Sequence, residues 1–168
     1  MEKQEKIVFS TESVIADMLR KPLRFRMYLL LKLPLAFLAG LRVERFDASV
    51  SEVSVPFRFL TKNPFKSTYF AALSMAAELS SGLQAMDAVQ RSPRPVSMLV
   101  LHMKADFIKK ARSRIFFKSN DGSAIIQAVK ECLQSTEGQT ITVCTKGFDS
   151  NGLHVATFWF TWTFKQKQ

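Results

Sequence analysis

One acidic residue stands alone in a long apolar segment of the chain. Between Ser67 and Met86 the only charged side chain is Glu78, and its neighbours are alanines, serines, leucines and methionines at helical spacing. A helix that is apolar nearly all round is usually buried, and there an unpaired carboxylate is unfavourable and its pKa tends to rise. Two interpretations follow: Glu78 is a functional acid or base, or it is held by a buried salt bridge or a helix end.

Small residues share the helix stripe of this carboxylate. At three- and four-residue steps, Ala71 and Ser74 precede Glu78, and Ser81 and Gly82 follow it. Small side chains let a sheet pack closely against a helix, and they equally leave a slot for an extended ligand. The pattern leaves both uses open.

A group of basic side chains lies further along the chain, around an expected bend between two strands. A single surface charge usually faces only solvent, but the group together could receive the phosphates of an anionic ligand. Its members are Lys104, Lys109, Lys110, Arg112 and Arg114. The formal net charge of +10 also suits an anionic partner.

Composition limits the class of protein. The 168 residues fit one domain, and the 47% hydrophobic and 23% charged content is that of a folded chain. Two cysteines and two histidines lack metal-site spacing, so we expect no metal, no cofactor and no disulfide. No sequence motif supports nucleic-acid binding. The start MEKQEKIVFS lacks the apolar run of a signal peptide, so a cytoplasmic location is expected.

An apolar run at residues 27–41 raises the question of a membrane. Its length of about 22 Å as a helix is short of the roughly 30 Å hydrocarbon core, and Lys32 and Pro34 interrupt it. We expect a buried or interface helix within a helical arm, residues 1–40, that packs on the domain. Peripheral membrane contact through the arm and its basic residues is a less favoured alternative.

Periodicity and turn residues predict the elements that position these side chains. Helical pieces start at Ser10 or Thr11 and end at Gly40. The other expected elements are a strand at 53–59, a helix at 66–86, strands from 96 and at 112–118, a helix capped by Ser123, and strands at 139–148 and 153–164. Pro56 indicates that the first strand is an edge or carries a bulge. The order predicts an α+β fold with an antiparallel sheet.

The segment around the carboxylate resembles a known family. Asn63, a short linker, the pair Tyr69-Phe70 and the run AALSMAAEL ending near Glu78 resemble hot-dog-fold acyl-CoA thioesterases of the phenylacetate-degradation type. The resemblance covers roughly residues 41–164 and is closest to a poorly characterised branch with an N-terminal helical arm. It implies a hot-dog domain at 41–168, with a long central helix wrapped by a curved antiparallel sheet. It also implies a homodimer or tetramer with sites at the subunit interface.

The resemblance implies roles for individual residues in thioester hydrolysis. Glu78 would activate water or attack the carbonyl, Asn63 would hold the water or the carbonyl, and the backbone N–H of Phe70 would polarise the thioester oxygen. Acyl-CoA would be the substrate. Its expected contacts are Tyr69, Ala71, Ser74, Lys109, Lys110 and Arg112.

The chain departs from the family pattern in two places. Tyr69 stands where the family has histidine, and Phe70-Ala71 stand where it has two glycines, whose bare backbone allows close approach. Glu78 stands where the family pattern has aspartate, and the extra methylene shifts its carboxylate by about 1.5 Å. The alternative function is therefore a non-catalytic acyl- or lipid-binding module.

Overall fold

The computed structural model describes residues 8–135 and 137–167, and in these residues the chain forms five α-helices, one 3-10 helix and six strands. The helices are α1 (Val14–Leu19), α2 (Pro22–Lys32), α3 (Pro34–Ala39), α4 (Phe70–Gln90) and α5 (Gly122–Cys132), with the 3-10 helix η1 at Phe59–Thr61. The strands are β1 (Arg42–Phe46), β2 (Ser51–Val55), β3 (Val96–Phe107), β4 (Ile115–Ser119), β5 (Gln139–Asp149) and β6 (His154–Gln166).

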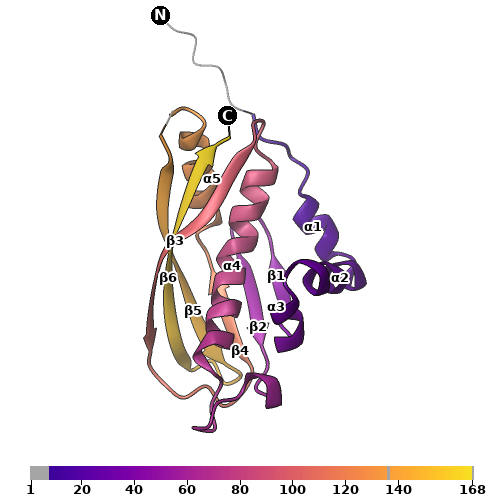
Figure 1. Ribbon diagram of the computed structural model, residues 1–168, viewed down its shortest axis with the longest axis vertical. Helices are drawn as coiled ribbons and strands as arrows, with labels where there is room; N and C mark the ends of the chain where they lie inside the picture. Colours follow the sequence, from indigo (N-terminus) through magenta and orange to yellow (C-terminus); the bar gives the residue numbers. More distant parts are fainter. Residues whose placement is uncertain (1–7, 136, 168) are drawn as a thin grey trace, which may run out of the picture.

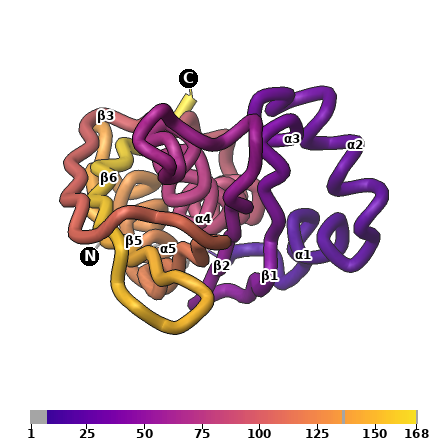
Figure 2. Tube along the Cα trace, turned by 90° about the horizontal axis from the view of Figure 1, so that it is seen from below, coloured from indigo at the N-terminus to yellow at the C-terminus, as the bar shows by residue number. Residues whose placement is uncertain are grey.

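A single antiparallel sheet is curved around the long helix α4. Its strand order is β1-β2-β4-β5-β6-β3, so β1 and β3 form the two edges. Figure 1 shows α4 lying along the sheet, and Figure 2 shows, from one end, the strands arranged around it. The α+β class that the element order predicts is confirmed, and the arrangement is the hot-dog fold that the family resemblance implies.

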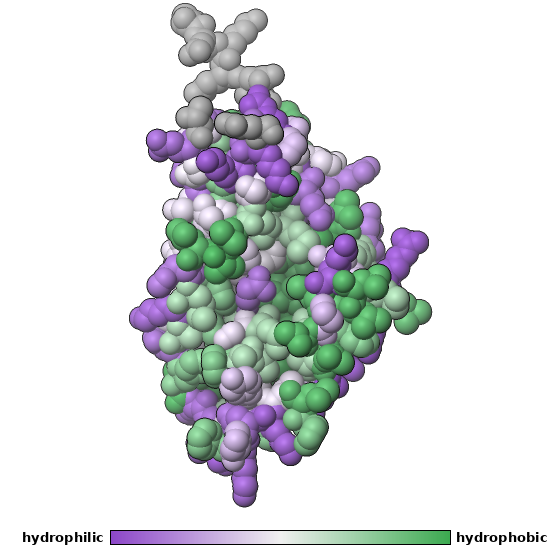
Figure 3. Space-filling view, in the orientation of Figure 1, coloured by the Kyte–Doolittle hydropathy of each residue, from purple (hydrophilic) through white to green (hydrophobic). Residues whose placement is uncertain are grey.

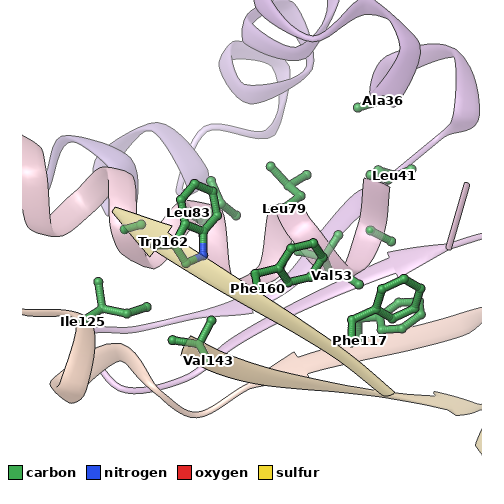
Figure 4. Close-up of a cluster of buried hydrophobic side chains, with 14 of the residues drawn as sticks. Ala36, Leu41, Val53, Leu79, Leu83, Phe117, Ile125, Val143, Phe160 and Trp162 are labelled. Carbon is green, nitrogen blue, oxygen red and sulfur yellow. The ribbon is translucent and has the colours of Figure 1, made fainter. Parts of the chain in front are cut away.

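The core lies between α4 and the concave face of the sheet. In Figure 4, Phe160 of β6 and Val143 of β5 lie on the sheet side of α4, whereas Leu79 points to the other side of the helix, toward Ala36 and Leu41. The helix forms because alanine, leucine, methionine and serine dominate it and proline is absent, and burial of its apolar sides then stabilises it. As expected, alternate residues of β6 from Phe158 to Phe164 are buried. The opposite face of β6 is mostly half-buried in the single chain.

The N-terminal helices pack beside α4 and β1, on the right in Figure 1. Ser13 caps α1 and also donates a hydrogen bond of 2.5 Å to the carboxylate of Asp87 in α4. Pro34 begins α3 immediately after α2, and Gly40, with φ of 74°, ends it. Residues 1–7 of the expected arm lie outside the described residues, and the division of the chain at residue 40 stays a prediction.

The apolar run of the arm is less buried than expected. Phe25, Leu29 and Ala36 face the interior, but Leu31 and Leu35 are 71% and 69% exposed. The interruption at Pro34 turns only one side of each short helix toward the domain. Within the described residues, no helix is both long and apolar enough to cross a membrane.

Several predicted elements are corrected. A strand that the sequence analysis missed, β1, forms the edge, so β2 lies inside the sheet and Pro56 simply follows its end. Helix α4 begins at Phe70, since the preceding residues form a loop, and it extends to Gln90. Asp121, and not Ser123, stands at the N-cap of α5, and its carboxylate accepts a 2.8 Å hydrogen bond from the backbone N–H of Cys144.

Candidate active site

Two backbone hydrogen bonds hold the start of α4 in place. The N–H of Tyr69 donates to the carbonyl of Thr61 at 2.7 Å, and the N–H of Thr68 donates to the carbonyl of Ala111 at 2.7 Å. Thr61 ends η1, and Ala111 belongs to the loop between β3 and β4. The first turn of α4 is therefore fixed between two loops that are far apart in the sequence.

Asn63 orders the loop that leads into α4. Its side-chain oxygen accepts hydrogen bonds from the N–H of Phe65 at 3.0 Å and from the N–H and hydroxyl of Ser67, both at 3.2 Å. Its amide nitrogen donates to the carbonyl of Thr68 at 3.4 Å. An amide nitrogen carries two hydrogens, so Asn63 retains one donor for a ligand, while its oxygen is engaged in the loop.

The first turn of α4 presents free backbone donors. Within residues 8–135 and 137–167, the N–H groups of Phe70 and Ala71 have no hydrogen-bond acceptor, and Tyr69 provides no side-chain cap. Free N–H groups and the positive end of the helix dipole together favour an anion or a developing oxyanion. The rings of Tyr69 and Phe70 meet edge to face at 4.8 Å, and Phe70 is 54% exposed. The Phe70 ring therefore does not enter the core.

A cavity of about 570 Å³ opens beside these donors. Five of the predicted site residues line it: Asn63, Tyr69, Phe70, Lys109 and Lys110. Its wall includes no acidic side chain within the described residues, so the two lysines make it electropositive. Backbone hydrogen bonds from Ile108 and Lys109 to the carbonyl of Val155 tie the lysine loop to β6.

Ala71 and Ser74 lie on the half-buried side of α4 that leads away from this cavity. The hydroxyl of Ser74 donates to the carbonyl of Phe70 at 2.9 Å, one turn back along the helix. That bond satisfies the hydroxyl locally, which is common for serine inside a helix. Because both side chains are small, they leave space beside α4 between Phe70 and Glu78.

The Glu78 carboxylate is largely removed from water. No side chain or backbone group in the described part of the chain forms a hydrogen bond or an ion pair with its carboxylate, so the salt bridge considered above is not found. Burial raises its pKa to about 7. One turn on, a Cβ at Gly82 would lie 2.9 Å from Oε1 of Glu78 and 3.5 Å from Trp162. The absence of a side chain at Gly82 gives the carboxylate its room.

Glu78 lines a second cavity of about 290 Å³ between α4 and the N-terminal arm. Its other walls are mostly apolar and come from both sides of the gap. They are Lys32, Leu33, Pro34, Leu35 and Ala36 of the arm and Met75 and Leu79 of α4. Figure 3 shows apolar surface continuing from α4 onto the arm in this region.

The predicted site residues are thus divided between two places within one chain. The N–H groups of the first turn point toward the N-terminal end of α4, whereas Glu78 lies about 12 Å further along the helix in the opposite direction. Phe70 and Glu78 of the same chain therefore cannot face one reacting group. The cavity at the start of α4 has the donors, and the cavity beside the arm has the carboxylate.

The other basic residues are dispersed. Arg112 is exposed and lies outside both cavities. Arg114 lines a separate cleft and donates to the hydroxyl of Ser54 at 2.8 Å. Lys104 projects from β3 over the ring of Trp159, 4.9 Å from its centroid. Of the basic cluster, only Lys109 and Lys110 join the cavity at the start of α4.

The sequence analysis missed several residues that line these cavities. Leu73 follows Phe70 by three residues, and Met75 precedes Glu78 by three, so helical spacing could have identified both. Leu79 is the residue next to Glu78. No local sequence pattern predicts that residues 33–36 line the second cavity, because this depends on how the arm packs against α4. Other missed residues around the first cavity are Phe65, Thr68, Phe107 and Ile108.

Comparisons with known proteins agree with this fold. A family model described as a domain of unknown function, DUF4442, matches residues 23–164. Among curated proteins, none matches the sequence.

Three solved structures illustrate the likeness. A Pseudomonas aeruginosa protein described as a probable thioesterase superposes with a TM-score of 0.71 at 19% identity, covering 87% of this chain and 97% of its own. A Chlorobaculum tepidum protein of unknown function gives 0.74 at 14% identity, covering 90% and 96%. A Haemophilus influenzae thioesterase gives 0.57 at 11% identity, covering 83% and 88%. At these identities the likeness is one of fold.

Proposed function

We propose that this chain, which belongs to the DUF4442 family, hydrolyses an acyl-CoA or a related thioester. The observation that carries the proposal is the unpaired Glu78 carboxylate, whose pKa of about 7 is matched to general-base chemistry near neutral pH. Fold neighbours described as thioesterases support the same class of reaction.

The proposed reaction uses Glu78 as the base for a water molecule. Glu78 takes a proton from the water as its oxygen attacks the thioester carbonyl carbon. The carbonyl oxygen becomes an oxyanion, which the free N–H groups of Phe70 and Ala71 stabilise. The C–S bond then breaks, and the departing sulfur receives the proton from Glu78. The products are a carboxylic acid and a thiol.

The two groups act together only if two chains build the site. Ser74 lies midway between Phe70 and Glu78 on α4. Consider a homodimer whose twofold axis passes near Ser74, so that the two α4 helices run antiparallel. Phe70 of one chain then faces Glu78 of the partner subunit. The small side chains of Ala71 and Ser74 let the two helices approach. Such a pair would bring the N–H groups and the carboxylate together at one site.

The outer strand β3 supports the same homodimer. It is an edge strand with exposed Leu99 and Leu101. An unpaired, apolar edge of this length is usually covered in solution. We propose a cytoplasmic homodimer in which β3 and α4 contribute to the interface.

Coenzyme A would lie at the cavity beside the start of α4. Lys109 and Lys110 would meet its phosphates there, with Tyr69 against the thiol arm. The remaining amide hydrogen of Asn63 would contact the thioester oxygen or the attacking water. Arg112, which is exposed outside the cavity, would act only at long range.

Two substitutions of Phe70 test the oxyanion role. Phe70→Pro removes the N–H at the first helical position, where proline is tolerated, and Tyr69 already has the extended conformation that a following proline requires. We expect it to reduce turnover about 10²- to 10³-fold. Phe70→Ala keeps the N–H and serves as the matched control, with a much smaller loss. Equal losses in both variants would contradict the role of the N–H.

Subunit mixing tests the composite site. Phe70→Pro and Glu78→Gln chains are each inactive, but a 1:1 mixture contains dimers with one intact site. Half of the dimers contain one chain of each variant, and in each of these dimers one of the two sites is intact. About a quarter of the wild-type activity should therefore return. No recovery would contradict a site shared between chains. Absence of thiol release by the wild type from every acyl-CoA would instead favour the binding-module alternative.

A further inference from the structure

We propose that the cavity between the N-terminal arm and α4 binds the acyl chain of the substrate, so that the arm selects medium-length apolar acyl groups. The inference rests on the proposed thioester hydrolysis and extends it to the class of substrate. Its basis is the position of Glu78, whose carboxylate forms part of the wall of this cavity.

The chemistry of the wall specifies the occupant. Apart from Glu78 and Lys32, the lining side chains are aliphatic, proline or methionine. Ala36 and Leu79 are 7% and 3% exposed and form the inner part, whereas Leu35 is 69% exposed and lies at the open side. An apolar group entering here loses water on several sides without leaving a polar partner unsatisfied. An acyl chain fits this description, and a sugar or a nucleotide does not.

The volume sets the length of the chain. A group of about the size of water occupies roughly 30 Å³, and a methylene is similar in size. A cavity of about 290 Å³ therefore accommodates roughly ten such groups. An acyl chain of about ten carbons would fill it, whereas an acetyl group would leave most of it empty.

The placement of Glu78 orients that chain. A base that activates water must lie near the carbonyl carbon, so the carbonyl would stand beside Glu78 and the hydrocarbon tail would continue between Met75 and the arm. In the twofold site, coenzyme A then lies on the subunit that provides the Phe70 N–H. The tail lies against the arm of the subunit that provides Glu78.

Substitutions in the arm test the inference. Ala36→Phe fills the inner part of the cavity, and Leu38→Phe adds the same ring on the exposed side of the same helix as a control. We expect wild type and Leu38→Phe to prefer decanoyl-CoA over acetyl-CoA. Ala36→Phe should lower the ratio of their kcat/KM values at least about tenfold, since each excluded methylene contributes about threefold to fourfold. Met75→Ala, which enlarges the cavity, should shift the preference to longer chains.

Direct binding separates this inference from the proposed function. Decan-1-ol, which cannot be hydrolysed, is titrated by calorimetry into wild type, Ala36→Phe and Leu38→Phe. Binding that only Ala36→Phe loses would support the acyl cavity even if the wild type hydrolysed no thioester. An unchanged decanoyl-to-acetyl ratio in a folded, active Ala36→Phe protein would overturn the inference and leave the hydrolase assignment standing. Should Ala36→Phe fail to fold, a Met75→Ala protein with unchanged chain-length preference would overturn it equally.

Discussion

Helix α4 has two carboxylates in different surroundings. Near its C-terminal end, Asp87 is 3% exposed and fully engaged, since it accepts hydrogen bonds from Ser13 at 2.5 Å and from Arg91 at 3.3 Å. In the middle of the helix, Glu78 has no such partner in the described part of the chain, and its pKa is raised to about 7.

The difference separates a carboxylate that holds the fold from one that is available for chemistry. Asp87 links the start of α1 to α4, and both of its buried carboxylate oxygens accept a hydrogen bond. Burial of Glu78 has a desolvation cost that no contact within residues 8–135 and 137–167 offsets. No contact in the described part of the chain makes the Glu78 carboxylate useful to the fold, which agrees with the role on a substrate proposed above. Four measurements test whether the two carboxylates have these different roles.

The largest expected effect is on turnover. Glu78→Gln keeps the side-chain volume and removes the base, so acyl-CoA hydrolysis should fall about 10²- to 10⁴-fold. The folded state should lose no stability, because no partner is left unpaired. Thiol release and thermal unfolding are measured on the same samples. Full activity in folded Glu78→Gln protein would end the catalytic assignment.

The next effect is the pH dependence of stability. Because the folded state holds the Glu78 proton up to a pKa of about 7 and the unfolded state releases it near 4.5, the unfolding free energy should fall as pH rises between these values. The loss should reach about 3 kcal/mol and level off above pH 7. Urea unfolding across this range checks it. Glu78→Gln should abolish this pH-dependent loss of stability, and Asp87→Asn should retain it. The hydrolysis rate of the wild type should rise with pH and reach a plateau above pH 7, where Glu78 is ionised.

A smaller effect is expected at the paired carboxylate. Asp87→Asn weakens the contacts with Ser13 and Arg91, so the unfolding free energy should fall by about 2 kcal/mol. The melting temperature should drop by roughly 4–8 °C for a chain of this size. The rate per folded molecule should stay near that of the wild type. A large loss of turnover with unchanged stability would reverse the roles assigned to the two carboxylates.

The smallest effect concerns the space around Glu78. Gly82→Ala should favour the helix by up to about 1 kcal/mol, but its methyl group displaces the carboxylate, whose Oε1 would lie 2.9 Å away. Turnover should therefore fall about tenfold while stability holds or rises. Measuring turnover and urea unfolding on the same preparation separates the effect on catalysis from the effect on stability. Unchanged turnover would show that the exact position of the carboxylate matters little.

Local patterns in the sequence were sufficient for most of the fold. Alternation along β6, the proline-free run of α4 and the Asp149 to Gly152 turn each specify structure through neighbours in sequence. Strand β1 was missed because its residues, Arg42 to Phe46, are mostly exposed at the sheet edge and show no apolar alternation. The true start of α4 depended on the loop bonds of Asn63, which composition does not reveal.

The candidate site residues came from different kinds of evidence. The isolation of Glu78 in an apolar helix singled it out, the family resemblance singled out Phe70, and the basic residues around an expected strand bend included Lys109 and Lys110. The sequence could not show that Phe70 and Glu78 of one chain point into different cavities, because that depends on the direction of backbone N–H groups. Nor could it show that the arm lines the second cavity, since residues 33–36 and α4 meet only in the folded chain.

The backbone bonds at the start of α4 have a consequence for how such a site can diversify. The donors of Phe70 and Ala71 are held by main-chain contacts at Thr68 and Tyr69, and none of these depends on the identity of the side chains at positions 69 and 70. Substitutions at positions 69 and 70 other than proline could therefore change the side chains around the proposed thioester site while these two N–H groups keep their place. In the proposed reaction, these main-chain contacts would keep the donors in place with Tyr-Phe-Ala where the resembling enzymes have His-Gly-Gly.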